Sequence, residues 1–194
     1  MDSLTSPIKA KTMTGDTKQN MHGSSSKRRE LKMSDDQQTL ADKLKEPFPV
    51  KSIHWRIGAR TKDKAKGIAL AYIDARDVMH RLDMVVGPLK WQCRYSHVTQ
   101  KGVICEIGIH VDGEWIWRAN GAGDTDVEAE KGAMSDAFKR AAVMWGIGRY
   151  LYMLPNTWVA LENDGKKLSG TPNLPAWATP EGYKAALAKR GTKE

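Results

Sequence analysis

Apolar residues occupy every second position from Val103 to Val111, and this alternation, closed by Asp112-Gly113, constrains the fold more than any other feature of the chain. A period of two puts these side chains on one face of a β-strand. An Asp-Gly pair between two strand-like runs favours a two-residue hairpin turn, because both turn positions need a positive φ. We therefore expect antiparallel strands over residues 103–111 and 114–120, with a third strand before them at residues 91–98.

Two segments have the spacing of amphipathic helices. In the shorter one Asp74 suits the N-cap, with Asp77 three residues later, and Gly87-Pro88 ends the helix. The longer one follows a capping box made by Thr125 and Glu128 and should end near Gly146 or Gly148. Its apolar stripe, typical of a helix packed on a sheet, consists of Met134, Ala137, Phe138, Ala141 and Trp145.

Together these elements predict an α+β fold of antiparallel hairpins and a β-meander, with a long helix packed across the sheet. A second hairpin is expected within residues 47–72, and a minor one within residues 158–168 around Asn163-Asp164-Gly165. Short helices are expected at residues 34–44 and 179–190.

The composition divides the chain into one domain and two tails. Residues 1–46 are polar and almost free of aromatic residues, so they predict a flexible tail in which the run Lys27-Arg28-Arg29 is solvated; contact with phosphates or a targeting role is the alternative. Residues 47–159 form the predicted core domain. Residues 160–194 form a carboxy-terminal extension with a short helix.

Positive charge is concentrated in the first hairpin. The chain has a formal net charge of +8, which suits a polyanionic partner. Between Lys51 and Lys66 there is one acid, Asp63, and the basic residues are Lys51, Arg56, Arg60, Lys62, Lys64 and Lys66. This hairpin is therefore the densest candidate surface for phosphates.

Several other classes of function are disfavoured. Cys93 and Cys105 fit neither a zinc-ligand spacing nor a disulfide framework, and the histidines show no metal-ligand spacing. No phosphate-cradling loop or catalytic triad can be named. A metal-dependent nuclease is an alternative, but Asp112 is explained by its turn and the acids between Asp126 and Glu130 by the start of a helix. We expect no enzyme activity, no cofactor, no metal and no membrane segment, and an intracellular, cytoplasmic protein.

Four strings, in this order, carry a resemblance to a known family: YIDARDVMHRLDMVVGPLKW, DGEW, GAGDTDVEAEKGAMSDAFKRAAVMWGIGRYLY and LP. They resemble the phage Sak-type single-strand annealing proteins, which in turn are similar to the DNA-binding amino-terminal domain of the Rad52 recombination family. The resemblance covers roughly residues 48–159.

The resemblance implies ATP-independent binding and annealing of single-stranded DNA in recombination and double-strand break repair, in a phage or prophage protein of the bacterial cytoplasm. It also implies a homo-oligomeric ring of about ten or more subunits with an outer basic groove. A single-stranded DNA-binding protein or an exonuclease is a further expected partner. The basic groove residues of the family fall on Lys139 and Arg140, less surely on Lys131, and on either Arg56 or Arg60; a tyrosine of the family falls on Tyr72.

Helix geometry supports the same chemistry. Lys131, Ser135 and Lys139 recur on one helix face, where they can hold phosphates while the bases stay free. For Arg140 the alternative is an ion pair with Asp136 four residues earlier. For Arg149 the alternative is capping of the helix carbonyls.

The aromatic residues leave two interpretations open. Trp115 and Trp117 share a strand face and are expected to pack in the core against the long helix, with base stacking as the alternative. A passive single-strand coating protein would use the same groove as an annealing protein, and the sequence does not separate the two.

Overall fold

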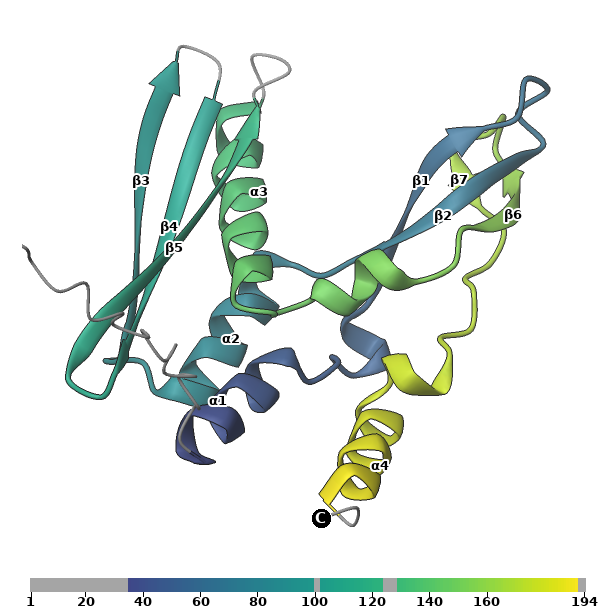
Figure 1. Ribbon diagram of the computed structural model, residues 1–194. Helices are drawn as coiled ribbons and strands as arrows, with labels where there is room; N and C mark the ends of the chain where they lie inside the picture. The colour runs from purple at the N-terminus through teal and green to yellow at the C-terminus, as the bar shows by residue number, and fades with distance from the viewer. Residues whose placement is uncertain (1–34, 100–101, 124–128, 192–194) are drawn as a thin grey trace, which may run out of the picture. The chain divides into compact units, whose positions relative to one another are not determined.

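The protein has an α+β fold of antiparallel strands, as the sequence predicts, and the strands form two separate sheets (Figure 1). The computed structural model describes residues 35–99, 102–123 and 129–191. These residues lie in one compact unit, Met33–Glu194. One sheet has the strand order β1-β2-β6-β7 and the other the order β3-β4-β5. Short 3-10 turns lie at Val50–Ser52, Arg149–Met153 and Ala176–Ala178.

The three-stranded sheet consists of β3 (Trp91–Thr99), β4 (Gly102–Val111) and β5 (Glu114–Gly123). The predicted hairpin is confirmed, because Val111 pairs with Glu114 and the turn residues Asp112 and Gly113 have φ values of 52° and 88°. The alternating residues of β4 face the core, where Cys105, Ile107 and Ile109 are fully buried.

Helix α3 (Ala129–Met144) packs on β4 and β5 (Figure 1). Phe138, Ala137 and Ala141 are buried, and the indole Nε1 of Trp145 donates a hydrogen bond of 3.1 Å to the carbonyl of Ile107. Met134 was expected in the buried stripe, but it is 41% exposed, because Ala133 takes the inward position one residue earlier. The predicted capping box of Thr125 and Glu128 lies outside the described residues.

Trp115 and Trp117 do not face the long helix, which corrects the prediction. They pair across the ladder with His110 and Gly108, on the sheet face opposite the buried alternation of β4. Trp117 covers Gly108, where a Cβ would lie 2.9 Å from three of its ring atoms. The guanidinium of Arg94 stacks on the Trp117 ring at 3.9 Å. Base stacking by these tryptophans, the alternative that the sequence left open, is not tested by the structure.

Helix α2 (Ala75–Val86) begins and ends where the sequence predicts. The carboxylate of Asp77 accepts a hydrogen bond of 3.1 Å from the backbone N–H of Asp74, completing a capping box. At the other end Gly87 has a φ of 91°, which residues with a side chain rarely adopt.

The four-stranded sheet contains β1 (His54–Arg60), β2 (Lys66–Tyr72), β6 (Thr157–Glu162) and β7 (Lys167–Leu168). The two predicted hairpins are thereby confirmed, and β6 pairs alongside β2, so both belong to one sheet. Strand β6 crosses the predicted domain boundary after Val159.

Helix α1 (Asp35–Lys45) confirms the short helix expected at residues 34–44, but it is no part of a tail. Leu44 is 2% exposed and lies in the core. Arg81 of α2 donates hydrogen bonds to the carbonyls of Lys43, Leu44, Glu46 and Pro47, which connects the two helices. The run Lys27-Arg28-Arg29 lies outside the described residues.

Helix α4 (Pro180–Gly191) confirms the last predicted helix. Its Tyr183 donates a hydrogen bond of 3.3 Å to the carbonyl of Asp42, and its Lys184 lies 3.2 Å from a carboxylate oxygen of Glu46. In the part of the chain that the structure describes, no helix combines the length and the apolar character needed to cross a membrane.

Candidate nucleic-acid interface

The register of β1 and β2 separates the two candidate arginines. His54 pairs with Tyr72 and Arg56 with Leu70, so Arg56, His54 and Tyr72 share one face of the sheet. The register then shifts between Ile57 and Arg60, and Arg60 pairs with Gly67. This β-bulge places Arg60 on the opposite face, although residues four apart in a regular strand share a face.

Tyr72 connects the sheet to helix α3. The ammonium nitrogen of Lys139 lies 5.7 Å from the centroid of the Tyr72 ring, and the His54 ring lies 5.4 Å from it on the other strand. Lys139 and Tyr72 are half-buried. A cation at this distance from an aromatic face gains about 0.5–1 kcal/mol at an exposed site. The contact therefore orients Lys139 beside Tyr72 while leaving its charge in reach of a ligand.

We define the Tyr72 face by four residues: His54, Arg56, Tyr72 and Lys139. It combines two permanent cations, an imidazole and a phenol, all of which can donate hydrogen bonds to phosphate oxygens. Three of these residues, Arg56, Tyr72 and Lys139, are predicted from the sequence. His54 is not, because only the strand register brings it next to Tyr72.

His54 also faces two acids at the start of α2. Its Nε2 lies 3.5 Å from a carboxylate oxygen of Asp74, and both groups are exposed. Ligand atoms of His54, Asp74 and Asp77 lie within 4.8 Å of one another, a trio that the sequence spacing did not indicate. Both carboxylates already serve the capping box of α2, which accounts for their positions.

Arg140 adopts the alternative that the sequence left open. Its Nε lies 2.8 Å from a carboxylate oxygen of Asp136, four residues earlier on the exposed side of α3. The hydrogen bond and the charge of Asp136 raise the pKa of Arg140. Such an exposed pair contributes little stability, so phosphate can compete for the guanidinium.

Arg149 caps the end of α3. Its Nε and Nη2 donate to the carbonyl of Val143 at 2.9 and 2.6 Å, and Nη2 also donates to the carbonyl of Met144 at 3.0 Å. These carbonyls belong to the last turn of α3, where the negative end of the helix dipole makes a cation stabilising. Contact of Arg149 with DNA stays a prediction.

Three lysines of the first hairpin, Lys62, Lys64 and Lys66, lie far from Tyr72 along the strands. Lys62 and Lys64 are exposed in the β1–β2 turn, and Lys66 begins β2. Lys66 and Tyr72 are six positions apart, which corresponds to about 20 Å of extended strand. These lysines cannot bind the same phosphate as Lys139. The side chain of Lys131 lies outside the described part of α3.

The turn is itself ordered by hydrogen bonds. Asp63 accepts a hydrogen bond of 3.0 Å from the N–H of Ala65, and hydrogen bonds from Thr61 and Ala65 lower the pKa of its carboxylate. The charge of Asp63 is therefore engaged within the turn, while the neighbouring lysine side chains are exposed.

The fold and the site define an α+β protein in which a hairpin and a long helix present a shared cationic face. Comparison with known proteins identifies the family of the chain. Residues 36–168 match the model of the Rad52/22 family of double-strand break repair proteins, and the chain belongs to this family.

Two relatives share most of its length. The chain is 39% identical over 159 residues to the single-stranded DNA-binding protein DdrA of Deinococcus deserti. The aligned region covers 78% of this chain and 73% of that protein. It is 35% identical over 159 residues to the protein of the same name from Deinococcus radiodurans, covering 78% and 71%.

Proposed function

We propose that this protein binds single-stranded DNA through the Tyr72 face and anneals complementary strands without ATP, in recombination and double-strand break repair. One observation carries the proposal: Lys139 of α3 lies over the ring of Tyr72, on the sheet face that also presents Arg56. Membership of the Rad52/22 family supports the biological setting. The two relatives are named single-stranded DNA-binding proteins, which supports single-stranded DNA as the ligand.

The chemistry of the face fits strand annealing. Lys139 and Arg56 offer charge to phosphates, and such contacts carry no sequence information. A strand held by its phosphates keeps its base edges free to pair with a second strand. Tyr72 adds a ring edge and a hydroxyl at the same place, without a set of donors and acceptors that would select particular bases.

A homo-oligomeric ring belongs to the same proposal. Among the described strands, β3 and β5 each end their sheet, with 9 and 10 residues. Unpaired strand edges of this length favour contacts between copies of a chain, and head-to-tail contacts close into a ring when the rotation allows. The phage or prophage origin, the cytoplasmic location and the additional protein partners stay predictions from the sequence.

A passive coating protein is the second candidate, and the names of the two relatives, single-stranded DNA-binding proteins, favour it. Coating and annealing need the same phosphate contacts but have opposite effects on pairing. We suggest mixing the protein with two complementary fluorescent oligonucleotides in a buffer without ATP or divalent metal. Faster duplex formation supports annealing, slower formation supports coating, and no binding of either strand contradicts both.

A further inference from the structure

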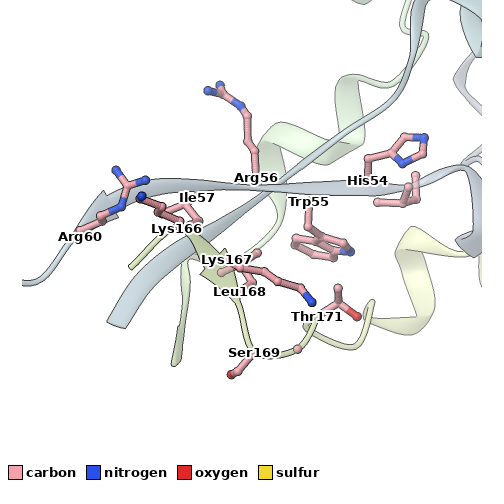
Figure 2. Close-up of a pocket in the computed structure, with 12 residues that line it drawn as sticks. His54, Trp55, Arg56, Ile57, Arg60, Lys166, Lys167, Leu168, Ser169 and Thr171 are labelled. Carbon is pink, nitrogen blue, oxygen red and sulfur yellow. The ribbon is translucent and has the colours of Figure 1, made fainter. Parts of the chain in front are cut away.

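An open groove lies along the free edge of β1 (Figure 2). It has a volume of about 770 Å³ and runs between β1 and residues 166–171, which include β7. Among the described strands β1 pairs only with β2, so its other edge faces this groove with unpaired backbone groups. We call it the β1–β7 groove.

The groove is strongly basic. No acid is among the residues that line it, and its four permanent cations are Arg56, Arg60, Lys166 and Lys167. Trp55 is half-buried and points toward Lys167 and Thr171, while Arg56 and His54 project from the other side of the strand (Figure 2). Cations beside an aromatic ring are the combination that single-strand binders use for phosphates and bases.

The wall of the groove is held in place before any ligand arrives. Arg60 donates a hydrogen bond of 3.0 Å from Nε to the carbonyl of Gly165 in the β6–β7 turn. A Cβ on Gly165 would lie 3.0 Å from the Cβ of Lys64, so the two hairpin turns are in contact. Such pre-organisation lowers the cost of ordering the site when a ligand binds.

The groove is continuous with the Tyr72 face. His54 and Arg56 line the groove, and they also belong to the sheet face that carries Tyr72. A chain molecule bound at Lys139 can therefore pass Arg56, cross the edge of β1 and reach Lys166 and Lys167. The bulge in β1 supplies a cation, Arg60, on the far side of that edge.

We propose that the β1–β7 groove holds a stretch of the single strand adjoining the part held at the Tyr72 face. Lys166 and Lys167 bind phosphates, and Trp55 offers a surface on which a base stacks. This inference rests on the proposed binding of single-stranded DNA, and it gives residues 166–171 a part in that binding which the sequence pattern does not indicate.

The test begins with the unmodified protein. Lysines are acetylated with an amine-reactive reagent, with and without a poly(dT) probe of about 30 nucleotides, which is longer than the roughly 4–16 nucleotides that one single-strand-binding domain covers. Mass spectrometry then measures the acetylation of each lysine. We expect the probe to protect Lys139, Lys166 and Lys167 but not the exposed Lys43 of α1.

The second measurement is the salt dependence of DNA binding by the double variant Lys166→Ala/Lys167→Ala. Its matched control is Lys43→Ala/Lys90→Ala, which removes two exposed lysines that do not line the groove. Since each single-strand phosphate contact contributes about 0.7, the slope of log K against log salt should fall by about 1.4 in the groove variant and stay unchanged in the control.

Protection of Lys139 without protection of Lys166 and Lys167, together with an unchanged slope, would overturn the inference and leave the proposed function intact. Failure of the unmodified protein to bind the probe would instead remove the proposed function. An acidic peptide is the competing occupant. If the groove variant loses binding of a polyglutamate probe but keeps the full DNA salt slope, the groove serves a protein and the inference is wrong.

Discussion

Replacement of Lys139 by methionine removes its charge and keeps most of its apolar stem. The side chain is half-buried and contacts Tyr72 at 5.7 Å, so the lost cation–π contact should cost at most about 1 kcal/mol of folding stability. The loss in DNA binding appears in the dependence of the affinity on salt. One single-strand phosphate contact contributes about 0.7 to the salt slope, which corresponds to about fivefold weaker binding near 0.1 M salt.

The assay is fluorescence anisotropy with a labelled poly(dT) oligonucleotide over a series of salt concentrations. Circular dichroism checks that the variant is folded. Lys43→Met is the matched control, because Lys43 is an exposed lysine on another helix, α1. The reasoning predicts a slope reduced by about 0.7 per occupied site for Lys139→Met and no change for the control.

The same measurement can refute the assignment. If the folded Lys139→Met protein retains the full slope, Lys139 contacts no phosphate and the Tyr72 face is not the binding surface. If both variants lose the same amount, the binding reflects overall charge rather than a site.

Three further outcomes are expected from the packing. Arg81→Met should lower the free energy of unfolding in urea by about 2–4 kcal/mol, because it removes charged hydrogen bonds to several carbonyls at the end of α1. Gly108→Val should cost about 1–3 kcal/mol in the same assay and change the tryptophan fluorescence, because a Cβ there meets the ring of Trp117 at 2.9 Å. A hydrogen bond from Cys105 lowers the pKa of Cys93 to about 6 and raises that of Cys105. Iodoacetamide should therefore label Cys93 first, at a rate that rises as the pH passes about 6, as peptide mapping would show.

Local chemistry made much of the fold predictable. The turn at Asp112-Gly113 needs a positive φ at both positions, and Asp and Gly adopt it more readily than most residues. Asp74 and Asp77 determine the start of α2 because they form its capping box. In these elements the residues that decide the structure are neighbours in the sequence.

The face on which Trp115 and Trp117 lie follows from the hairpin turn, although the apolar pattern alone places them in the core. A two-residue turn pairs Val111 with Glu114, and the ladder then pairs Ile109 with Ile116 and His110 with Trp115. Since Ile109 belongs to the buried alternation, Trp115 has to lie on the other face.

The remaining features depend on contacts between distant segments. The bulge in β1 places Arg56 and Arg60 on opposite faces of the sheet, and the sequence pattern does not predict it. The pairing of β6 with β2 brings Lys166 and Lys167 beside the first hairpin, about a hundred residues away in the chain. The spacing of residues in the sequence does not predict a contact between segments so far apart.

The central claim is that this protein pairs complementary strands by holding their phosphates at the Tyr72 face. The most direct measurement is the rate of duplex formation between two complementary oligonucleotides, without ATP or divalent metal, for the unmodified protein, Lys139→Met and Lys43→Met. We expect acceleration by the unmodified protein and by Lys43→Met, and a clearly smaller acceleration by Lys139→Met. No acceleration by the unmodified protein, or equal acceleration by all three, would contradict it.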